Sequence, residues 1–214
     1  MILFTCAVFP LCFLFISSLF YKESLREKDT WVNYFIGVLI GVPVFIFLFT
    51  LRNPMPVEFS KSRLYVHGLW NDHLLILLFP VVLYLAASFF VPRFSICGEA
   101  EEPFYPAFSF FSGFYTLVVL NDLLVFPYLN DIYLLFLLPV LRISTMISVT
   151  LSFTCFSKLF GFKRYILLFF SAATVFAVPA ATMFYRINYI SLAILTCVII
   201  LAWAVLALVF FRDE

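Results

Sequence analysis

The sequence predicts an all-α fold, a polytopic bundle of transmembrane helices, and three observations carry that prediction. The chain of 214 residues is 65% hydrophobic and only 12% charged, which leaves too few polar residues to cover a water-soluble domain. Its apolar residues come in continuous runs of about 20, the length at which a helix crosses a ~30 Å hydrocarbon layer. These runs lack the polar–apolar alternation of membrane-barrel strands. We expect one integral membrane domain over residues 1–214.

Seven spans are expected, each a window of sufficient apolar length. They cover approximately residues 2–20, 31–51, 73–92, 107–127, 132–157, 165–185 and 189–211. Only Arg186, Ile187 and Asn188 separate the last two, so a tight helical hairpin is required there, and without it the number of spans would be six. An internal proline, which frees a backbone carbonyl and favours a kink, occurs in five spans. These prolines are Pro10, Pro43, Pro80, Pro139 and Pro179.

Lysine and arginine in the loops predict the orientation of the chain, because cytoplasmic loops carry an excess of both. With the N-terminus outside, the inner side holds Lys22, Arg26, Lys28, Arg93, Lys158, Lys163, Arg164 and Arg212. The outer side holds only Arg52, Lys61, Arg63 and Arg186. The first span has no basic residue ahead of it and no cleavage site after it, so it is expected to stay as an anchor. We therefore predict a protein of the cell (inner) membrane with its N-terminus outside and its C-terminus cytoplasmic.

The stretch from Ser62 to Leu75 contains the only two histidines, His67 and His73, with Asn71 and Asp72 between them. Asn71 and Asp72 fit the start of the third span, where they would satisfy free backbone N–H groups. A ring such as that of His73 suits the membrane interface. On a continuous helix, His67 is separated by roughly 140° from Asp72 and roughly 120° from His73, so no metal site is expected. These three residues are weak candidates for catalysis.

Two charged residues fall within apolar spans. Asp122 follows Asn121 near the end of the fourth span, where its charge opposes the helix dipole. Arg142 lies near the middle of the fifth span. A charge inside the membrane costs a few kcal/mol and indicates a functional site with a partner to be named. We predict that Asp122 and Arg142 compensate one another, either on a transport pathway or only to fix helix packing.

Polar residues collect on one side of the membrane in this topology. The third and fifth spans both begin with Asn-Asp and both place a proline eight residues after the aspartate. Matched proline-containing segments point to the binding site in transporters, although capping and chance also account for the match. The polar groups expected together on the outer face are His67, Asn71, Asp72, His73, Asn121, Asp122, Asn130, Asp131 and Arg186.

Gly37 and Gly41 form a GxxxG pattern in the second span, which predicts close approach to another helix. The expected partners are the lipid bilayer and, through this second helix, a membrane protein or another copy of the chain. A net charge of +1 gives no reason to expect nucleic acid, and no motif calls for a cofactor.

Two functional hypotheses remain. The first is a non-enzymatic membrane protein, either a small transporter or the membrane subunit of a larger complex. The second is an intramembrane or interfacial enzyme that acts on a lipid or lipid-linked substrate, with His67 or His73 as acid or base and an aspartate as partner. The first is favoured because few polar groups are present for a catalytic constellation and no hydrolase or nucleotide-binding motif occurs.

Overall fold

The computed structural model describes residues 2–20, 28–51, 79–83, 86, 104–125, 132–155 and 161–211. Within these ranges every residue is helical except Gly161 and residues 187–189, and none lies in a strand, so the predicted all-α class is confirmed there. The long helices are α1 (Ile2–Phe20), α2 (Lys28–Leu51), α5 (Phe104–Val125), α6 (Leu138–Cys155), α7 (Phe162–Arg186) and α8 (Ile190–Phe211). A π-helical turn, η4 (Tyr133–Leu137), leads directly into α6.

Six of the predicted spans coincide with these helices to within three residues at each end. In α2, in η4 with α6, in α7 and in α8, the described residues include stretches long and apolar enough to cross a membrane. In α1 and α5 the described apolar stretches are shorter, Val8–Leu19 and Phe104–Val119. The predicted span 73–92 lies mostly outside the described residues, but those that are described within it, 79–83 and 86, are helical.

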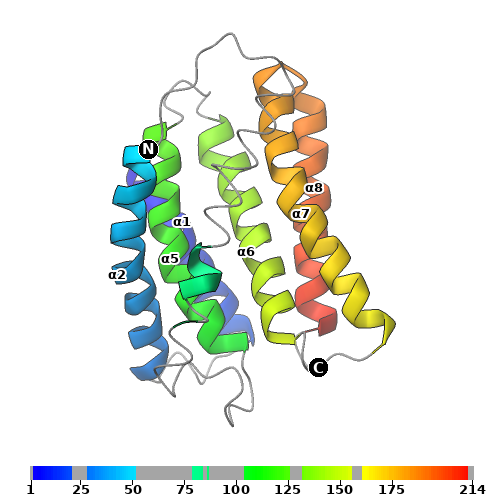
Figure 1. Ribbon diagram of the computed structural model, residues 1–214. Helices are drawn as coiled ribbons and strands as arrows, with labels where there is room; N and C mark the ends of the chain where they lie inside the picture. Colours follow the sequence, from blue (N-terminus) through cyan, green and yellow to red (C-terminus); the bar gives the residue numbers. More distant parts are fainter. Residues whose placement is uncertain are drawn as a thin grey trace.

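Helices that follow directly in the chain, α1 to α2 and α5 to α8, alternate in direction across the bundle. Figure 1 shows that α1 begins at the upper end and that α8 finishes at the lower end. The end of α5, the start of η4 and the α7–α8 hairpin all lie at the upper end. Contacts from Thr30 to Ser109 and from Tyr34 to Thr116 show that α2 and α5 run parallel. The predicted third span would supply the return that this parallel arrangement needs, and it lies mostly outside the described residues.

The α7–α8 hairpin confirms that the last two spans are separate helices. Its turn contains Asn188 with φ 63°, a left-handed conformation that asparagine tolerates better than most residues. The N–H of Tyr189 donates to the carbonyl of Phe184 at 2.9 Å, and that of Asn188 donates to Tyr185 at 3.1 Å. This pair of bonds is the Schellman arrangement that satisfies the last carbonyls of a helix. The chain can therefore reverse within three residues.

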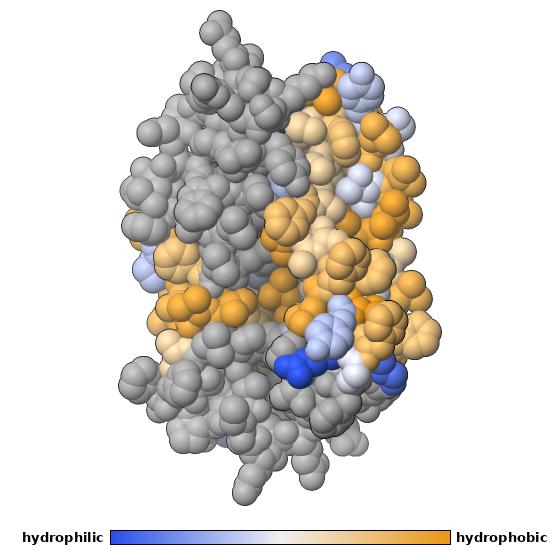
Figure 2. Space-filling view, turned by 45° about the vertical axis from the view of Figure 1, so that its right-hand side comes forward, coloured by the Kyte–Doolittle hydropathy of each residue, from blue (hydrophilic) through white to orange (hydrophobic). Residues whose placement is uncertain are grey.

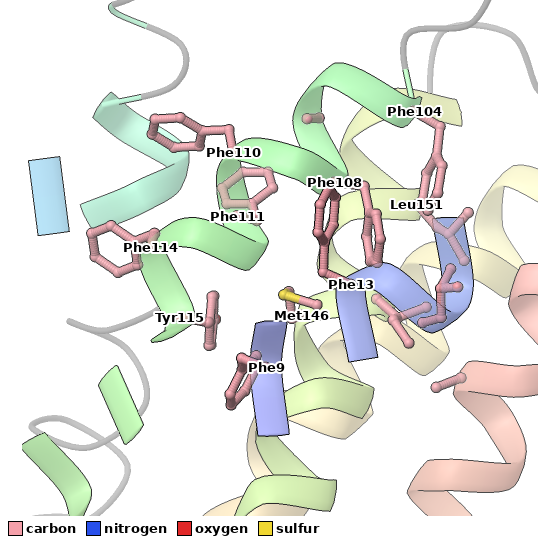
Figure 3. Packing of buried hydrophobic residues seen from close by; sticks show 14 of the residues in the cluster. Phe9, Phe13, Phe104, Phe108, Phe110, Phe111, Phe114, Tyr115, Met146 and Leu151 are labelled. Carbon is pink, nitrogen blue, oxygen red and sulfur yellow. The ribbon is translucent and has the colours of Figure 1, made fainter. Parts of the chain in front are cut away.

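Aromatic side chains fill the interior between α1, α2 and α5. Phe9 stacks on Tyr115 and Phe13 packs against Phe108, each pair with ring centroids 5.9 Å apart. Figure 3 shows these rings close to Met146 of α6, which belongs to the same buried cluster. A second cluster joins η4, α6, α7 and α8 around Tyr133, Leu141 and Val178. Abundant phenylalanine therefore serves the core here as well as the outer surface.

The outer surface of the α7–α8 side is apolar over most of its height. Figure 2 shows a mostly orange surface there, with a few pale-blue residues within it and the deep-blue residues at the two ends. Leucine, isoleucine, valine and phenylalanine side chains of α8 are exposed all along this helix. In water such a surface would be a large unfavourable patch, whereas lipid tails solvate it well. The described helices are thus those of a membrane-integrated protein.

A close helix contact lies between α2 and α5 at two glycines. A Cβ atom added to Gly37 would lie 2.1 Å from the carbonyl oxygen of Phe110, and one added to Gly113 would lie 2.0 Å from that of Tyr34. Each helix therefore presents a glycine to the backbone of the other, the arrangement that small residues permit in membranes. At Gly41 the nearest atom is the tip of the Leu117 side chain. The glycine face of α2 is thus filled by α5 of the same chain.

The topology gives a labelling prediction. In a cysteine-free background, Tyr189→Cys at the exposed hairpin is expected to react with an impermeant reagent added outside, because the loop charges predict that this end faces outward. Leu25→Cys, between α1 and α2, is expected to react only after the membrane is permeabilised. Labelling of position 25 from outside in intact cells, with position 189 protected, would show that the orientation is opposite to the predicted one.

Candidate functional site around Arg142 in helix α6

Helix α6 lies inside the bundle and carries a buried arginine and several serine and threonine residues. It contacts α1, α5, α7 and α8, so little of its surface is left for lipid. Arg142 is only 2% exposed, near the middle of the helical stretch 132–155. The hydroxyl residues of α6 are also buried or nearly so, and we call them the hydroxyl array: Ser144, Thr145, Ser148, Thr150, Ser152 and Thr154.

Most of the hydroxyl array is satisfied within α6 itself. Ser144, Thr145, Ser148, Thr150 and Thr154 each donate to the carbonyl four residues earlier, at 2.7–2.9 Å. This bond is the usual way in which a serine or threonine hydroxyl is accommodated where no water is available. The cost of burying these groups is thereby removed, and they stay available to exchange partners.

Two serines link α6 to α7 directly. Ser152 donates a short hydrogen bond to the hydroxyl of Ser171, and Ser171 donates to the carbonyl of Ser148 at 3.1 Å. Thr174, one turn further along α7, bonds to the carbonyl of Ser171 at 2.7 Å. Small hydroxyl side chains allow the two helices to pack closely and bond across their interface.

On the α5 side, Ser112 behaves differently from the hydroxyl array. Its hydroxyl is fully buried and is directed at α6, where it donates to the sulfur of Met146 at 3.9 Å. Within the described part of the chain this is its only hydrogen bond, and a thioether is a weak acceptor. Arg142 lies one helical turn from Met146 and so on the same face of α6. Ser112 and Arg142 therefore border the same α5–α6 interface.

A chain of hydroxyl groups extends this interface to α2. The hydroxyl of Thr116 donates to the carbonyl of Ser112 at 2.9 Å and also contacts the hydroxyl of Tyr34 at 3.0 Å. Threonine has only one hydroxyl proton, so Tyr34 must be the donor in the second bond. The protons thus point one way, from α2 through Thr116 to the backbone of α5.

The π turn η4 leads into the first residues of α6 and ends two residues before Pro139. Proline lacks an N–H and its ring clashes with the carbonyl four residues back, so a wider turn at this point relieves the conflict. Tyr133, fully buried in η4, shares a 2.5 Å hydrogen bond with Thr182 of α7 and packs on the ring of Tyr185 at 4.5 Å. The irregular turn is therefore fixed to α7 by a side chain that the sequence did not single out.

The structure describes only some of the predicted site residues. Arg142 is buried as expected for an interior charge, and it has an interaction partner. Arg186 is the last residue of α7, and the backbone at Asn121 and Asp122 falls in the last turns of α5, at the same end of the bundle. The side chains of Asn121 and Asp122 lie outside the described part of the chain. So do the predicted site residues His67, Asn71, Asp72, His73, Asn130 and Asp131.

The depth difference between Asp122 and Arg142 follows from the register of α5 and α6. These helices are antiparallel and are matched where Ser112 meets Met146. From that contact towards the end of the bundle where α5 ends and α6 begins, Arg142 is four residues away along α6 and Asp122 ten residues away along α5. At 1.5 Å per residue the backbones differ by about 9 Å in depth, a gap that a long arginine side chain reaching outward largely closes. The pair remains a prediction.

Sequence reasoning missed Ser112, Gly113, Tyr133 and Thr182. A lone serine or threonine in an apolar span is common. Its hydroxyl can bond to a carbonyl of its own helix or to a group on another helix, and which of the two occurs depends on the neighbouring helix. Gly113 had a weaker signal than the paired Gly37 and Gly41, because no second glycine lies four residues away. The hydroxyl array itself was visible in the segment STMISVTLSFT, whose polar residues recur at helical spacing.

The fold and the site together define a class: a multi-spanning helical membrane protein with a polar interior helix. Among the described residues, no three histidine, cysteine, aspartate or glutamate side chains gather as metal ligands would. Comparison with protein families, with characterised proteins and with solved structures finds no significant match for the chain. Function therefore has to be inferred from the site itself.

Proposed function

We propose that this protein is a small membrane transporter whose solute passes along α6. The observation that carries the proposal is Arg142, a charge that is 2% exposed in the middle of a helix lined by hydroxyl groups. A guanidinium at this depth costs several kcal/mol, and natural membrane proteins usually place such a charge on a solute or ion pathway.

The hydroxyl array supports the same proposal. From Ser144 to Thr154 hydroxyl groups recur along the helix over about 15 Å at 1.5 Å per residue, roughly half the thickness of the hydrocarbon layer. Hydroxyls can donate and accept, so each can release its own helix carbonyl to bind a passing solute. The π turn at the outer end adds a break in regular helix of the kind found beside transport sites.

The other hypotheses gain less support. The enzyme hypothesis rests on His67, Asp72 and His73, which lie outside the described residues. A membrane subunit of a complex, or a dimer through α2, would use the outer face of that helix, where Phe35, Leu39 and Ile46 are exposed. Lipid covers such a face equally well, so the exposed face does not favour a protein partner. The transport experiment below includes the subunit hypothesis as one of its outcomes.

Reconstitution into liposomes tests the proposal. Purified protein is expected to take up at least one labelled small solute from a panel of anions, cations and neutral polar molecules, above protein-free liposomes. Arg142→Gln should reduce this uptake more than tenfold, whereas Leu39→Ala on the lipid-facing side of α2 should leave it unchanged. Folded protein that moves no solute, and that is recovered from membranes in a stable complex, would instead favour the subunit hypothesis.

A further inference from the structure

We infer that the π turn η4 is a hinge, at which the segment Tyr133–Leu137 changes from the π to the α register and releases its contacts with α7 and α8. The inference concerns a motion of the fold, so it stands or falls independently of transport. Three features of η4 carry it: its hydrogen-bond register, the side chains that hold it, and the two prolines beside it.

The first feature is the register of η4. The N–H of Leu138 bonds to the carbonyl of Tyr133, five residues back, instead of four residues back as in an α-helix. A return to the α register would rotate Tyr133 around the helix axis by about 100° relative to α6, the angle of one residue at 3.6 residues per turn. Since π turns are rare and the α register is the common one, contacts with the surrounding helices must favour the π register here.

The second feature is the set of side chains that hold η4. Thr182 gives its only hydroxyl proton to the carbonyl of Val178 at 3.1 Å, so Tyr133 is the donor in the 2.5 Å bond between the two hydroxyls. The buried thiol of Cys197 on α8 donates to the carbonyl of Leu137, with 3.9 Å between sulfur and oxygen. A rotation of about 100° would take the Tyr133 hydroxyl out of reach of Thr182. The Tyr133–Thr182 bond, which we call the latch, therefore exists only in the π register.

The third feature is a pair of buried prolines close to the latch. Pro139 has no N–H, so no backbone hydrogen bond from that position has to break when the register changes. Pro179 of α7 lies three residues before Thr182 and also has no N–H to give to its own helix. The helices on both sides of the latch thus each lack one backbone bond. A change of register at η4 breaks few bonds besides the latch and the weak thiol contact.

The rate at which Cys197 is labelled measures this motion in the full chain. Cys197 is kept as the single cysteine, the other four are replaced by alanine, and the protein in detergent reacts with an uncharged maleimide well below its midpoint of thermal unfolding. A maleimide reacts with the thiolate, which forms when water reaches the buried thiol, so the rate reports local opening. Tyr133→Phe keeps the ring and removes the latch, and it should speed labelling about fivefold.

Tyr34→Phe is the matched control for this experiment. It removes the same kind of contact between two hydroxyl groups, but from the α2–α5 interface, and should leave the labelling rate of Cys197 unchanged. In a second protein whose only cysteine is Cys12 of α1, Tyr133→Phe should not alter labelling. Equal acceleration by the two tyrosine variants, or equal acceleration at the two cysteines, would show a general loosening of the bundle and would overturn the hinge.

Pro139→Ala separates a change of register from local loosening. Alanine restores the N–H and removes the ring that opposes a regular α turn, so the α register becomes more favourable. Labelling of Cys197 should therefore become faster, although the substitution strengthens the helix itself. An unchanged rate in Tyr133→Phe, or an unchanged or slower rate in Pro139→Ala, refutes the hinge.

Discussion

Gly113→Ala and Gly37→Ala are each expected to prevent α2 and α5 from packing. The added Cβ would lie 2.0 Å or 2.1 Å from a backbone oxygen of the other helix, and backbone atoms cannot move aside as a side chain can. The helices would have to separate along their whole contact, which costs about 3 kcal/mol or more. We expect a large loss of folded protein in detergent and a midpoint of thermal unfolding lowered by ten degrees or more.

Gly41→Ala is the matched control for this experiment. It lies one turn along from Gly37 on the same face of α2, but its new Cβ would meet only the end of the Leu117 side chain at 2.8 Å. That side chain can change rotamer, so the midpoint should shift by no more than a few degrees. If all three variants were equally stable, the close α2–α5 contact would not exist in the membrane.

Asp122→Asn and Arg142→Gln are the second pair of changes with a large expected effect. If the two residues compensate one another, removing either leaves an unbalanced charge in a poor solvent and costs several kcal/mol. Each single variant should give a low yield of folded protein, and the double variant should recover part of it. Such non-additivity identifies a direct interaction, and the yield and unfolding midpoint of the four proteins measure it.

Activity of the double variant separates the two roles of the pair. A purely structural pair predicts a folded double variant with normal uptake, whereas a pair on the pathway predicts a folded but inactive one. Additive losses in the two single variants would show that the residues act independently.

The spans were predictable because a membrane helix is defined by its own residues. An apolar run of sufficient length has to be helical in lipid whatever its neighbours are, so six predicted spans match helices of the structure closely. The α7–α8 hairpin followed from the same principle, since only three residues separate two such runs. Neighbour relations were not predictable, because lipid-facing and helix-facing apolar residues have similar hydropathy.

The candidate site was predictable only in part, for a related reason. An arginine within an apolar run is conspicuous in any sequence, and Arg142 was located from it. The role of Ser112 depends on which atom lies opposite on α6, and the parallel contact of α2 with α5 depends on packing across the bundle. Pro139 accounts for the π turn at η4. The hydrogen bond that holds this turn, from Tyr133 to Thr182, involves a helix about 50 residues further along the chain, so the sequence did not predict it.

The parallel pairing of α2 and α5 also constrains the order of events during synthesis. Their contacts join residues 79 and 82 positions apart, so the glycine face of α2 has no partner when α2 first enters the membrane. At 5–20 residues per second, α5 follows only about 4–16 s later. During that interval Gly37 and Gly41 expose a narrow groove to lipid or to an insertion factor. A ribosome pause before Phe104 would extend this interval, and a truncation there would remove α5 altogether. In either case α2 would lack its partner helix, and the chain would then be most open to mispairing and degradation.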